Sequence, residues 1–310
     1  MGIMRTVLLA GSQSPWLRRQ ATRRRFVRRA VSRFMPGEQL GDALAAAERL
    51  RAQGLPAVLT RLGENVASEA EADAVRDHYL GAFDAIAAQS AEAEISVKPT
   101  QLGLDLDRER CCARLLALVE RAHQRGNFVW IDMEQSGYVD ATLELTRRAR
   151  AVRANVGVCL QAYLRRTPAD LQALIPSGAG VRLVKGAYME PAEVAFPAKA
   201  DVDRAFLALA ETLLDAPARA AGVRAVFGTH DRALSASIRA AAARRGLGPA
   251  DCEFHMLFGI QAREQERLVA EGARVRVLVS YGDYWFPWYM RRLAERPANV
   301  LFVARSLFRR

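Results

Sequence analysis

Short apolar runs alternate with longer amphipathic stretches along most of this chain. From about residue 55 onward, a β-prone run recurs eight times, and a stretch rich in Ala, Leu, Arg and Glu with helical spacing follows each one. The predicted strands cover residues 57–62, 93–98, 128–132, 156–160, 181–184, 224–229, 253–257 and 274–279. The predicted helices lie near residues 68–90, 106–125, 139–154, 168–175, 199–216, 231–246, 261–271 and 284–296. Such alternation is typical of a parallel sheet that helices cover on both faces.

Eight strand–helix units, over about 250 residues, predict an α/β protein with the (βα)8 fold of the TIM barrel. The alternative is an open, doubly wound sheet, which more often carries a glycine-rich first turn. The chain has no G-x-G-x-x-G sequence, which favours the barrel. Residues 38–54 are predicted to form a further helix before the first strand. We therefore expect a basic N-terminal helical arm over residues 1–54 and a catalytic barrel domain over residues 55–310.

The N-terminal arm is strongly basic. Residues 1–37 contain nine arginines and no acidic residue, whereas the whole chain has a net charge of +11. Ser14 and Pro15 suit the start of a helix, and apolar residues then recur at helical spacing up to Phe34. Such a helix can lie on an anionic membrane surface or pack on the barrel with its arginines in solvent. Nucleic acid is disfavoured as a partner, because aromatic residues are not interleaved with basic ones elsewhere in the chain.

Composition narrows the class of protein. Hydrophobic residues make up 51% and charged residues 25% of the chain, as in globular proteins. No apolar run approaches the roughly 20 residues that a membrane-spanning helix needs. The four cysteines form no C-x-x-C pair, which indicates reduced thiols and a cytoplasmic location, with peripheral contact at the inner face of the membrane if the arm binds it. The four histidines lack H-x-H and H-E-x-x-H spacing, so we expect no metal site.

Polar residues gather where the predicted strands end. In a (βα)8 barrel these ends meet at one face, the barrel mouth, and burying many polar groups there is costly unless they are paired or face a ligand. Two acids, Asp132 and Glu134, follow the third strand without a third metal ligand. The residues at the predicted mouth are Lys98, Asp132, Glu134, Gln161, Arg182, Lys185, Thr229, His230 and His255.

The end of the chain carries a second candidate site. Read as a helix from about residue 286, it places Trp288, Arg291, Arg292 and Glu295 on one face. Two adjacent guanidiniums can bind a carboxylate through paired hydrogen bonds, and Glu295 lies one turn beyond Arg291 and can hold it. The alternative is an amphipathic helix with a solvated polar face.

Several motifs together resemble the proline dehydrogenase family, in its monofunctional bacterial type, which is a flavin-dependent branch of the (βα)8 barrels. The matching segments occur in the order of the family and cover residues 96–105, 131–134, 161–164, 181–188, 228–231, 253–257 and 285–297. The resemblance implies FAD at the barrel mouth. It also implies hydride transfer to flavin N5 from the carbon next to the ring nitrogen of L-proline, giving 1-pyrroline-5-carboxylate, and a quinone or another electron acceptor.

The resemblance also implies roles for individual residues. Arg182 corresponds to the residue near flavin N5, and Gln161 corresponds to one that contacts the flavin ring. The remaining cofactor positions are Val184, Lys185, Gly186, Ala187 and Tyr188, with Thr229 and His230 beside the adenosine half. Arg291 and Arg292 resemble the clamp for the substrate carboxylate. The supporting charges are Lys98, Asp132 and Glu295.

Four substitutions depart from the family pattern. Leu278 and Trp288 each stand where a tyrosine is usual, Ser280 replaces a proline, and His255 replaces a common glutamine. Exchanging these side chains would reshape the substrate pocket. We therefore also consider the same flavin chemistry on another cyclic amino acid, such as hydroxyproline or pipecolate. An alternative of a different class is a Schiff-base lyase or aldolase that uses Lys185.

Overall fold

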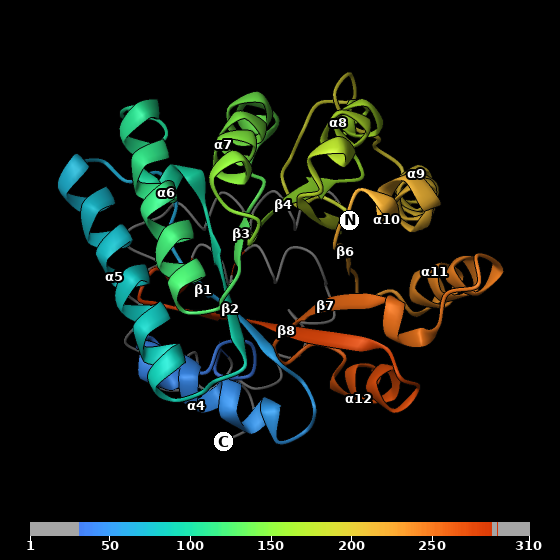
Figure 1. Cartoon of the computed structure of the whole chain (residues 1–310), viewed down its shortest axis with the longest axis horizontal. Helices are drawn as coiled ribbons and strands as arrows, with labels where there is room; N and C mark the ends of the chain where they lie inside the picture. The colour runs from blue at the N-terminus through green and yellow to red at the C-terminus, as the bar shows by residue number, and fades with distance from the viewer. Residues whose placement is uncertain (1–30, 287–289, 291–310) are drawn as a thin grey trace, which may run out of the picture.

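Eight parallel strands form a closed barrel in the order of the sequence, and β8 pairs with β1 to complete it (Figure 1). The computed structural model describes residues 31–286 and Met290. The strands are β1 (Ala57–Arg61), β2 (Ala93–Val97), β3 (Val129–Ile131), β4 (Val156–Gln161), β5 (Gly180–Val184), β6 (Ala225–Gly228), β7 (Glu253–Leu257) and β8 (Arg274–Tyr281). This topology confirms the predicted (βα)8 barrel and excludes the open, doubly wound sheet.

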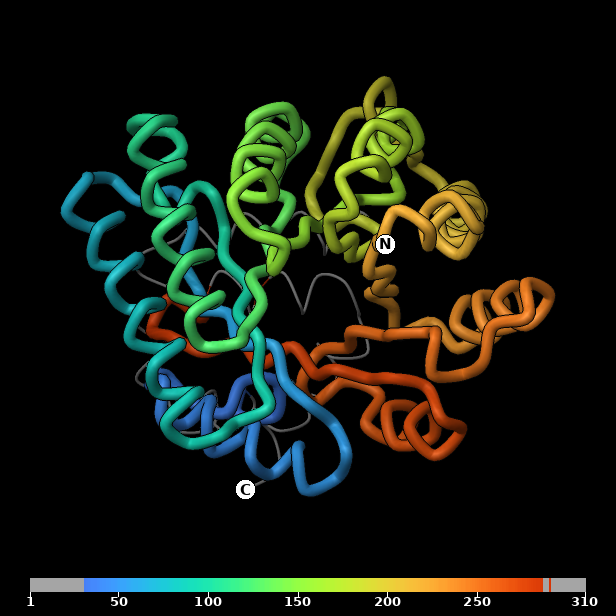
Figure 2. The backbone as a smooth tube through the Cα atoms, in the orientation of Figure 1, coloured from blue at the N-terminus to red at the C-terminus, as the bar shows by residue number. Residues whose placement is uncertain are grey.

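Helices surround the barrel, as the backbone tube in Figure 2 shows. They are α4 (Leu40–Arg51), α5 (Glu69–Ala88), α6 (Arg108–Gln124), α7 (Val139–Val152), α8 (Thr167–Leu174), α9 (Lys199–Leu214), α10 (Ala216–Ala220), α11 (Arg232–Arg244) and α12 (Ala262–Ala270). Short 3-10 helices are η1 (Pro99–Leu102), η2 (Ser136–Tyr138), η3 (Ile175–Ser177) and η4 (Pro249–Asp251). Of the predicted last helix, Trp285, Phe286 and Met290 are helical, and the other residues beyond Phe286 lie outside the described residues.

Side-chain caps fix where several helices begin. The Asp107 carboxylate accepts hydrogen bonds from the backbone N–H groups of Glu109 and Arg110, at 2.8 and 3.0 Å, before α6. Asp231 accepts from two backbone N–H groups at the start of α11, and Ser68 accepts from one at the start of α5. These caps satisfy backbone donors that the first helical turn leaves unpaired. They place the helix starts within two residues of the predicted ones.

The described end of the N-terminal arm packs on the barrel. The predicted helix at 38–54 is present as α4, and its Ala43, Leu44 and Leu50 are buried in the main hydrophobic core. Just before it, Val31 and Met35 are also buried, at 3% and 4% exposure. Residues 1–30, which hold eight of the nine arginines of the arm, lie outside the described residues. The boundary between arm and barrel at residues 54 and 55 therefore stays a prediction.

The barrel interior holds a small apolar layer between two charged clusters. Val58, Trp130 and Val226 form this layer, and the partly buried Leu278 packs against it. Two guanidiniums contact the Trp130 ring, with the Cζ atoms of Arg182 and Arg224 at 5.2 and 5.3 Å from its centre. Both distances suit cation–π contacts. Trp130 thus separates the charges of the mouth from those of the opposite end.

The cluster at the opposite end, where the strands begin, consists of Glu94, Arg224, Glu253 and Arg276, and we call it the basal cluster. Arg224 donates from Nη1 to Glu94 at 2.8 Å and from Nε and Nη2 to Glu253 at 2.9 and 2.5 Å. Arg276 lies 3.3 Å from each of the two carboxylates. Glu94 also accepts a 2.7 Å hydrogen bond from Trp130 Nε1. The basal cluster is therefore a closed network with two cations and two anions.

Candidate active site

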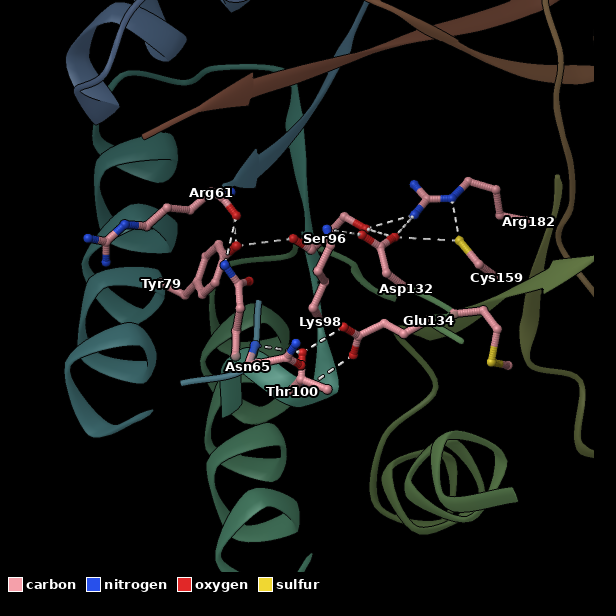
Figure 3. A network of polar contacts seen from close by, with 12 residues as sticks. Arg61, Asn65, Tyr79, Ser96, Lys98, Thr100, Asp132, Glu134, Cys159 and Arg182 are labelled. Carbon is pink, nitrogen blue, oxygen red and sulfur yellow. Dashed lines mark hydrogen bonds and ion pairs between the residues drawn. The ribbon is translucent and has the colours of Figure 1, made fainter. Parts of the chain in front are cut away.

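A second cluster lies at the carboxyl ends of β2 to β5 and is shown in Figure 3. We call it the mouth cluster, and it consists of Ser96, Lys98, Asp132, Cys159 and Arg182. Lys98 Nζ donates to Asp132 Oδ2 at 3.1 Å, and Arg182 Nη2 donates to Asp132 Oδ1 at 2.5 Å. The Ser96 hydroxyl donates to the same Oδ1 atom at 2.8 Å. The sequence prediction that Lys98, Asp132 and Arg182 meet at one mouth is thus confirmed by geometry.

The mouth cluster carries one more positive than negative charge. Burial opposes the charge of Asp132 most strongly, but Lys98 and Arg182 together hold the pKa of this carboxyl below its usual range. Burial likewise opposes the charge of Lys98, yet Asp132 and neighbouring groups raise the pKa of this amine. Burial acts most strongly on Arg182 and opposes its charge, but its contacts with Cys159 and Asp132 raise the pKa of this guanidinium. All three groups are therefore ionised at neutral pH, and the excess cation favours an anionic ligand.

Several buried polar atoms near the carboxyl ends of the strands have no partner among the described residues. Nη1 of Arg182 and Oε1 of Gln161 are two of them. The two residues come from adjacent strands, and each is no more than 4% exposed. Buried donors and acceptors are almost always paired in folded proteins, so a donor and an acceptor left open on adjacent strands suit a polar ligand. This arrangement fits the ring of a flavin, with its own donors and acceptors at one edge.

The segment after β5 is held against the β4–α8 loop. Gly186 has a φ of +113°, and a Cβ atom at this position would meet the Tyr163 ring at 2.2 Å. The Tyr163 N–H also donates to the Lys185 carbonyl at 2.9 Å. Glycine is therefore required both by the backbone conformation and by the close approach of Tyr163. The structure shows the backbone conformation of this stretch. The cofactor-binding role that the resemblance implies for it stays a prediction.

The Lys185 side chain is engaged outside the mouth cluster. Its Nζ lies 2.5 Å from Asp203 of α9 and 3.1 Å from Asp231, the residue that caps α11. A Schiff base forms when a lysine amine attacks the carbonyl of a bound substrate. The Lys185 amine is instead part of an ion-pair network in which Lys199 contacts the same two carboxylates. This network lies outside the mouth cluster, so the lyase alternative has no geometric support.

Thr229 and His230 follow β6, and His230 contacts the end of the neighbouring strand β7. His230 Nε2 accepts a 2.8 Å hydrogen bond from the Leu257 backbone N–H. Thr229 is 5% exposed, and its hydroxyl accepts from the Asp231 backbone N–H at 3.1 Å. Both residues therefore stand at the carboxyl end of β6, where the resemblance placed the adenosine half of the cofactor, and that role remains a prediction.

His255 differs from the prediction. The sequence placed it among the polar groups of the mouth, but it lies inside the barrel in the middle of β7. Its Nε2 is 3.1 Å from Glu253 of the basal cluster, and its ring meets the Trp130 ring edge-on at 5.4 Å between centroids. Burial lowers the pKa of His255 to about 4, although Glu253 acts in the opposite direction. His255 is therefore a neutral interior residue.

Glu134 is also separate from the mouth cluster, although the sequence grouped it with Asp132. Its carboxylate accepts from the Thr100 backbone N–H at 3.0 Å and from the Thr100 hydroxyl at 2.6 Å. It is 3% exposed, and burial raises its pKa to about 7 against the effect of these two hydrogen bonds. Glu134 thus joins the start of η1 to the loop after β3 and leaves Asp132 as the central acid.

The sequence prediction missed Cys159 and gave Ser96 no role. Both lie on the inner face of their strands and contact Arg182, through Sγ at 2.8 Å and Oγ at 2.7 Å. Cys159 precedes Gln161 by two residues, so the alternation of side chains along a strand places the two on the same face. This two-residue spacing from Gln161 is the sequence feature that could have indicated Cys159 as a site residue.

The remaining predicted site residues belong to β8 or follow it in the sequence. Leu278 lies on β8, opposite Val58 in register, and its side chain packs on the inner apolar layer. The predicted residues of the last helix lie outside the described residues. They are Trp288, Arg291, Arg292 and Glu295. Within the part of the chain that the structure describes, no helix is long and apolar enough to cross a membrane.

Comparison with known proteins identifies related sequences. The family model described as Proline dehydrogenase matches residues 43–305. Proline dehydrogenase 1 of Bacillus subtilis is 37% identical over 283 residues, which cover 91% of this chain and 92% of that protein. The proline dehydrogenase of Deinococcus radiodurans is 33% identical over 284 residues, which cover 90% of each.

Solved structures show the same fold. A crystal structure of proline utilization A from Bdellovibrio bacteriovorus, inactivated by N-propargylglycine, superimposes with a TM-score of 0.82 at 24% identity. The match covers 94% of this chain and 36% of that one, so this chain spans little more than a third of its length. At this identity the match supports the barrel fold.

Proposed function

The chain belongs to the proline dehydrogenase family and is an oxidoreductase, and on that premise we propose that it uses FAD to oxidise L-proline to 1-pyrroline-5-carboxylate. The observation that carries this proposal is the mouth cluster, where a buried excess of positive charge lies beside two open polar atoms, Arg182 Nη1 and Gln161 Oε1. The sequence relatives support the substrate, because they are named proline dehydrogenases and the similarity extends over nearly their whole length.

The described residues divide the work of holding the cofactor. FAD, when bound, would supply the acceptor for the hydride that leaves the carbon next to the ring nitrogen. Gln161 and Arg182 would contact its ring, and the backbone from Val184 to Tyr188 would run along it. Thr229 and His230 would lie by the adenosine half. The positive charge of Arg182 in a buried site stabilises negative charge that develops beside it during the reaction.

Other residues would hold the substrate. Arg291 and Arg292 would bind its carboxylate, with Glu295 orienting Arg291 and Trp288 beside the substrate ring. Lys98 and Asp132 would be the supporting charges, and their mutual 3.1 Å contact favours the ionised form of both. Holding the substrate at two ends in this way lowers the entropic cost of reaching the reactive geometry.

A second candidate substrate is favoured by one feature of the barrel interior. Leu278 joins the apolar layer with Val58 and Trp130 at the position where the family usually has a tyrosine. Leucine is smaller than tyrosine, so the loss of the phenol leaves more room, which would accept a substituted or larger cyclic amino acid such as hydroxyproline or pipecolate. The flavin chemistry would be the same.

An absorbance spectrum of the purified protein tests both proposals. We expect a flavin spectrum that is bleached anaerobically when L-proline is added. Hydroxyproline and pipecolate, added separately, would show whether the pocket prefers a different ring. A protein that neither contains nor takes up FAD would overturn the cofactor assignment, and a flavin that no cyclic amino acid bleaches would overturn the reaction.

We further propose a quinone as electron acceptor and a cytoplasmic protein whose arm contacts anionic lipid. The support is the arginine-rich sequence of residues 1–30. Deleting residues 1–30 retains the buried Val31 and Met35 and should abolish salt-sensitive binding to phosphatidylserine vesicles. Equal vesicle binding by the deleted and full-length proteins would contradict the membrane contact.

A further inference from the structure

Cys159 occupies an unusual place in the mouth cluster. It lies on β4, opposite Arg182 of β5 in register, and is 5% exposed. Arg182 Nε donates to its sulfur at 2.8 Å, and the sulfur lies 3.6 Å from Asp132 Oδ1 (Figure 3). The thiol therefore touches both members of the central ion pair.

The protonation state of this thiol decides whether it donates or accepts in each contact. Burial raises the pKa of Cys159 to about 11, although Arg182 acts in the opposite direction. At neutral pH the group is an S–H, which can accept a hydrogen bond from Arg182 and donate one to Asp132. It connects cation and anion without adding a charge of its own.

These contacts determine which edge of Arg182 stays open. Nε is bound to Cys159, and Nη2 is bound to Ser96 and Asp132. A guanidinium is planar and rigid, so fixing these two nitrogens also fixes the direction of the third. That third nitrogen, Nη1, is the buried donor without a partner. Without the sulfur, the group could turn about its Nη2 contacts.

We propose that Cys159 is a positioning residue that aims Arg182 Nη1 at the cofactor ring without touching the substrate. This inference rests on the proposed function, since it assigns Cys159 a role toward the flavin. The alternative is that Cys159 only fills space in the barrel.

Two substitutions and one control separate these roles. Cys159→Ala removes the hydrogen bonds, whereas Cys159→Ser retains an acceptor and a donor. Cys112→Ala is the matched control, because Cys112 is a fully buried cysteine on α6, outside the barrel. Each protein would be studied as the flavin-loaded enzyme, with the midpoint potential of the flavin and its affinity for sulfite as readouts. Both respond to a positive charge beside the ring and not to general packing.

For Cys159→Ala we expect a lower midpoint potential and a loss of sulfite affinity of roughly tenfold, the lower end of what outer-shell partners contribute. Cys159→Ser should recover most of both, and Cys112→Ala should match the wild type. Equal values for Cys159→Ala and Cys112→Ala would overturn the positioning role, as would a serine variant that behaves like alanine. A wild-type protein that takes up no flavin would instead refute the proposed function.

Discussion

The two charged clusters of the barrel are built from similar residues but differ in what they leave open. In the basal cluster, no nitrogen of Arg224 or Arg276 and no oxygen of Glu94 or Glu253 is among the buried polar atoms that lack a partner in the described residues. In the mouth cluster, Arg182 keeps one buried nitrogen without a partner. The two clusters also differ in charge, because the basal one balances two cations with two anions and the mouth one has an excess cation.

This difference separates scaffold from site. A closed ion network in a barrel ties strands together, and removing one member leaves an uncompensated buried charge. An open donor beside an excess cation is instead unfavourable until a ligand completes it. Trp130 lies between the clusters and stacks near a guanidinium of each. The comparison therefore predicts that changes below Trp130 affect stability and changes above it affect catalysis.

The largest effect is expected for Arg224→Met. It leaves Glu94 and Glu253 without their principal cation, and breaking a buried ion pair costs about 3–5 kcal/mol. Urea unfolding of the holoenzyme would measure this loss in the free energy of unfolding. Arg276→Met should cost less, since its contacts are longer, at 3.3 Å. Turnover per folded, flavin-loaded molecule should stay near that of the wild type in both variants. A loss of turnover without a loss of stability would contradict the assignment of the basal cluster to the scaffold.

Arg182→Met tests the other half of the comparison. Removing a donor that stabilises developing charge lowers kcat by about 100- to 1,000-fold. Anaerobic stopped-flow measurement of flavin reduction at saturating proline would show the loss in the chemical step. Unfolding should be changed less than in Arg224→Met. A variant that reduces its flavin as fast as the wild type would show that the open guanidinium does not serve the reaction.

The sequence was sufficient for the fold because the barrel strands are buried and nearly continuously apolar. It also predicted the meeting of Lys98, Asp132 and Arg182, since the carboxyl ends of parallel strands lie at one face. It could not give the pairing of Lys185 with Asp203 and Asp231, which depends on how α9 and α11 pack beside β5.

Two other residues show why contacts escape sequence patterns. In the sequence, Cys159 looks like a small apolar core residue. Its hydrogen bond with Arg182 becomes evident only when β4 and β5 are placed in register. His255 belongs to a strand that was predicted with the correct bounds. Its partner is Glu253, two residues earlier on the same face, so it faces the basal cluster. The predicted strand bounds indicate how far along the barrel axis a residue lies, but they do not show which side chains it contacts.

Glu134 sharpens the comparison because it lies at the mouth but is fully hydrogen-bonded, like a scaffold residue. Its pKa is raised from 4.5 to about 7, chiefly by burial. The stabilisation of its protonated form is therefore complete below pH 4.5 and is lost as the pH rises through 7, by roughly 3 kcal/mol in total. Glu134→Gln should remove this pH dependence while changing turnover little.

Unfolding of wild type and Glu134→Gln at several pH values between 4.5 and 8 would measure the effect. The difference between the two proteins isolates Glu134 from His78 and His255, whose pKa values burial lowers to about 4 and whose effect on stability has the opposite sign. Parallel stability curves for the two proteins would show that Glu134 does not change its protonation in this range.

The smallest effect is expected at the boundary between the clusters, for Leu278→Tyr. A phenol at this position would take up more space beside Val58 and Trp130 and restore the usual residue of the family, so we expect selectivity for proline over pipecolate to rise about tenfold. The ratio of the two kcat/KM values measures this change. Leu278→Met is the control, because it preserves volume and should keep the wild-type ratio. If tyrosine and methionine gave the same ratio, Leu278 would belong to the scaffold with the apolar layer, and the site would begin only at the level of Arg182.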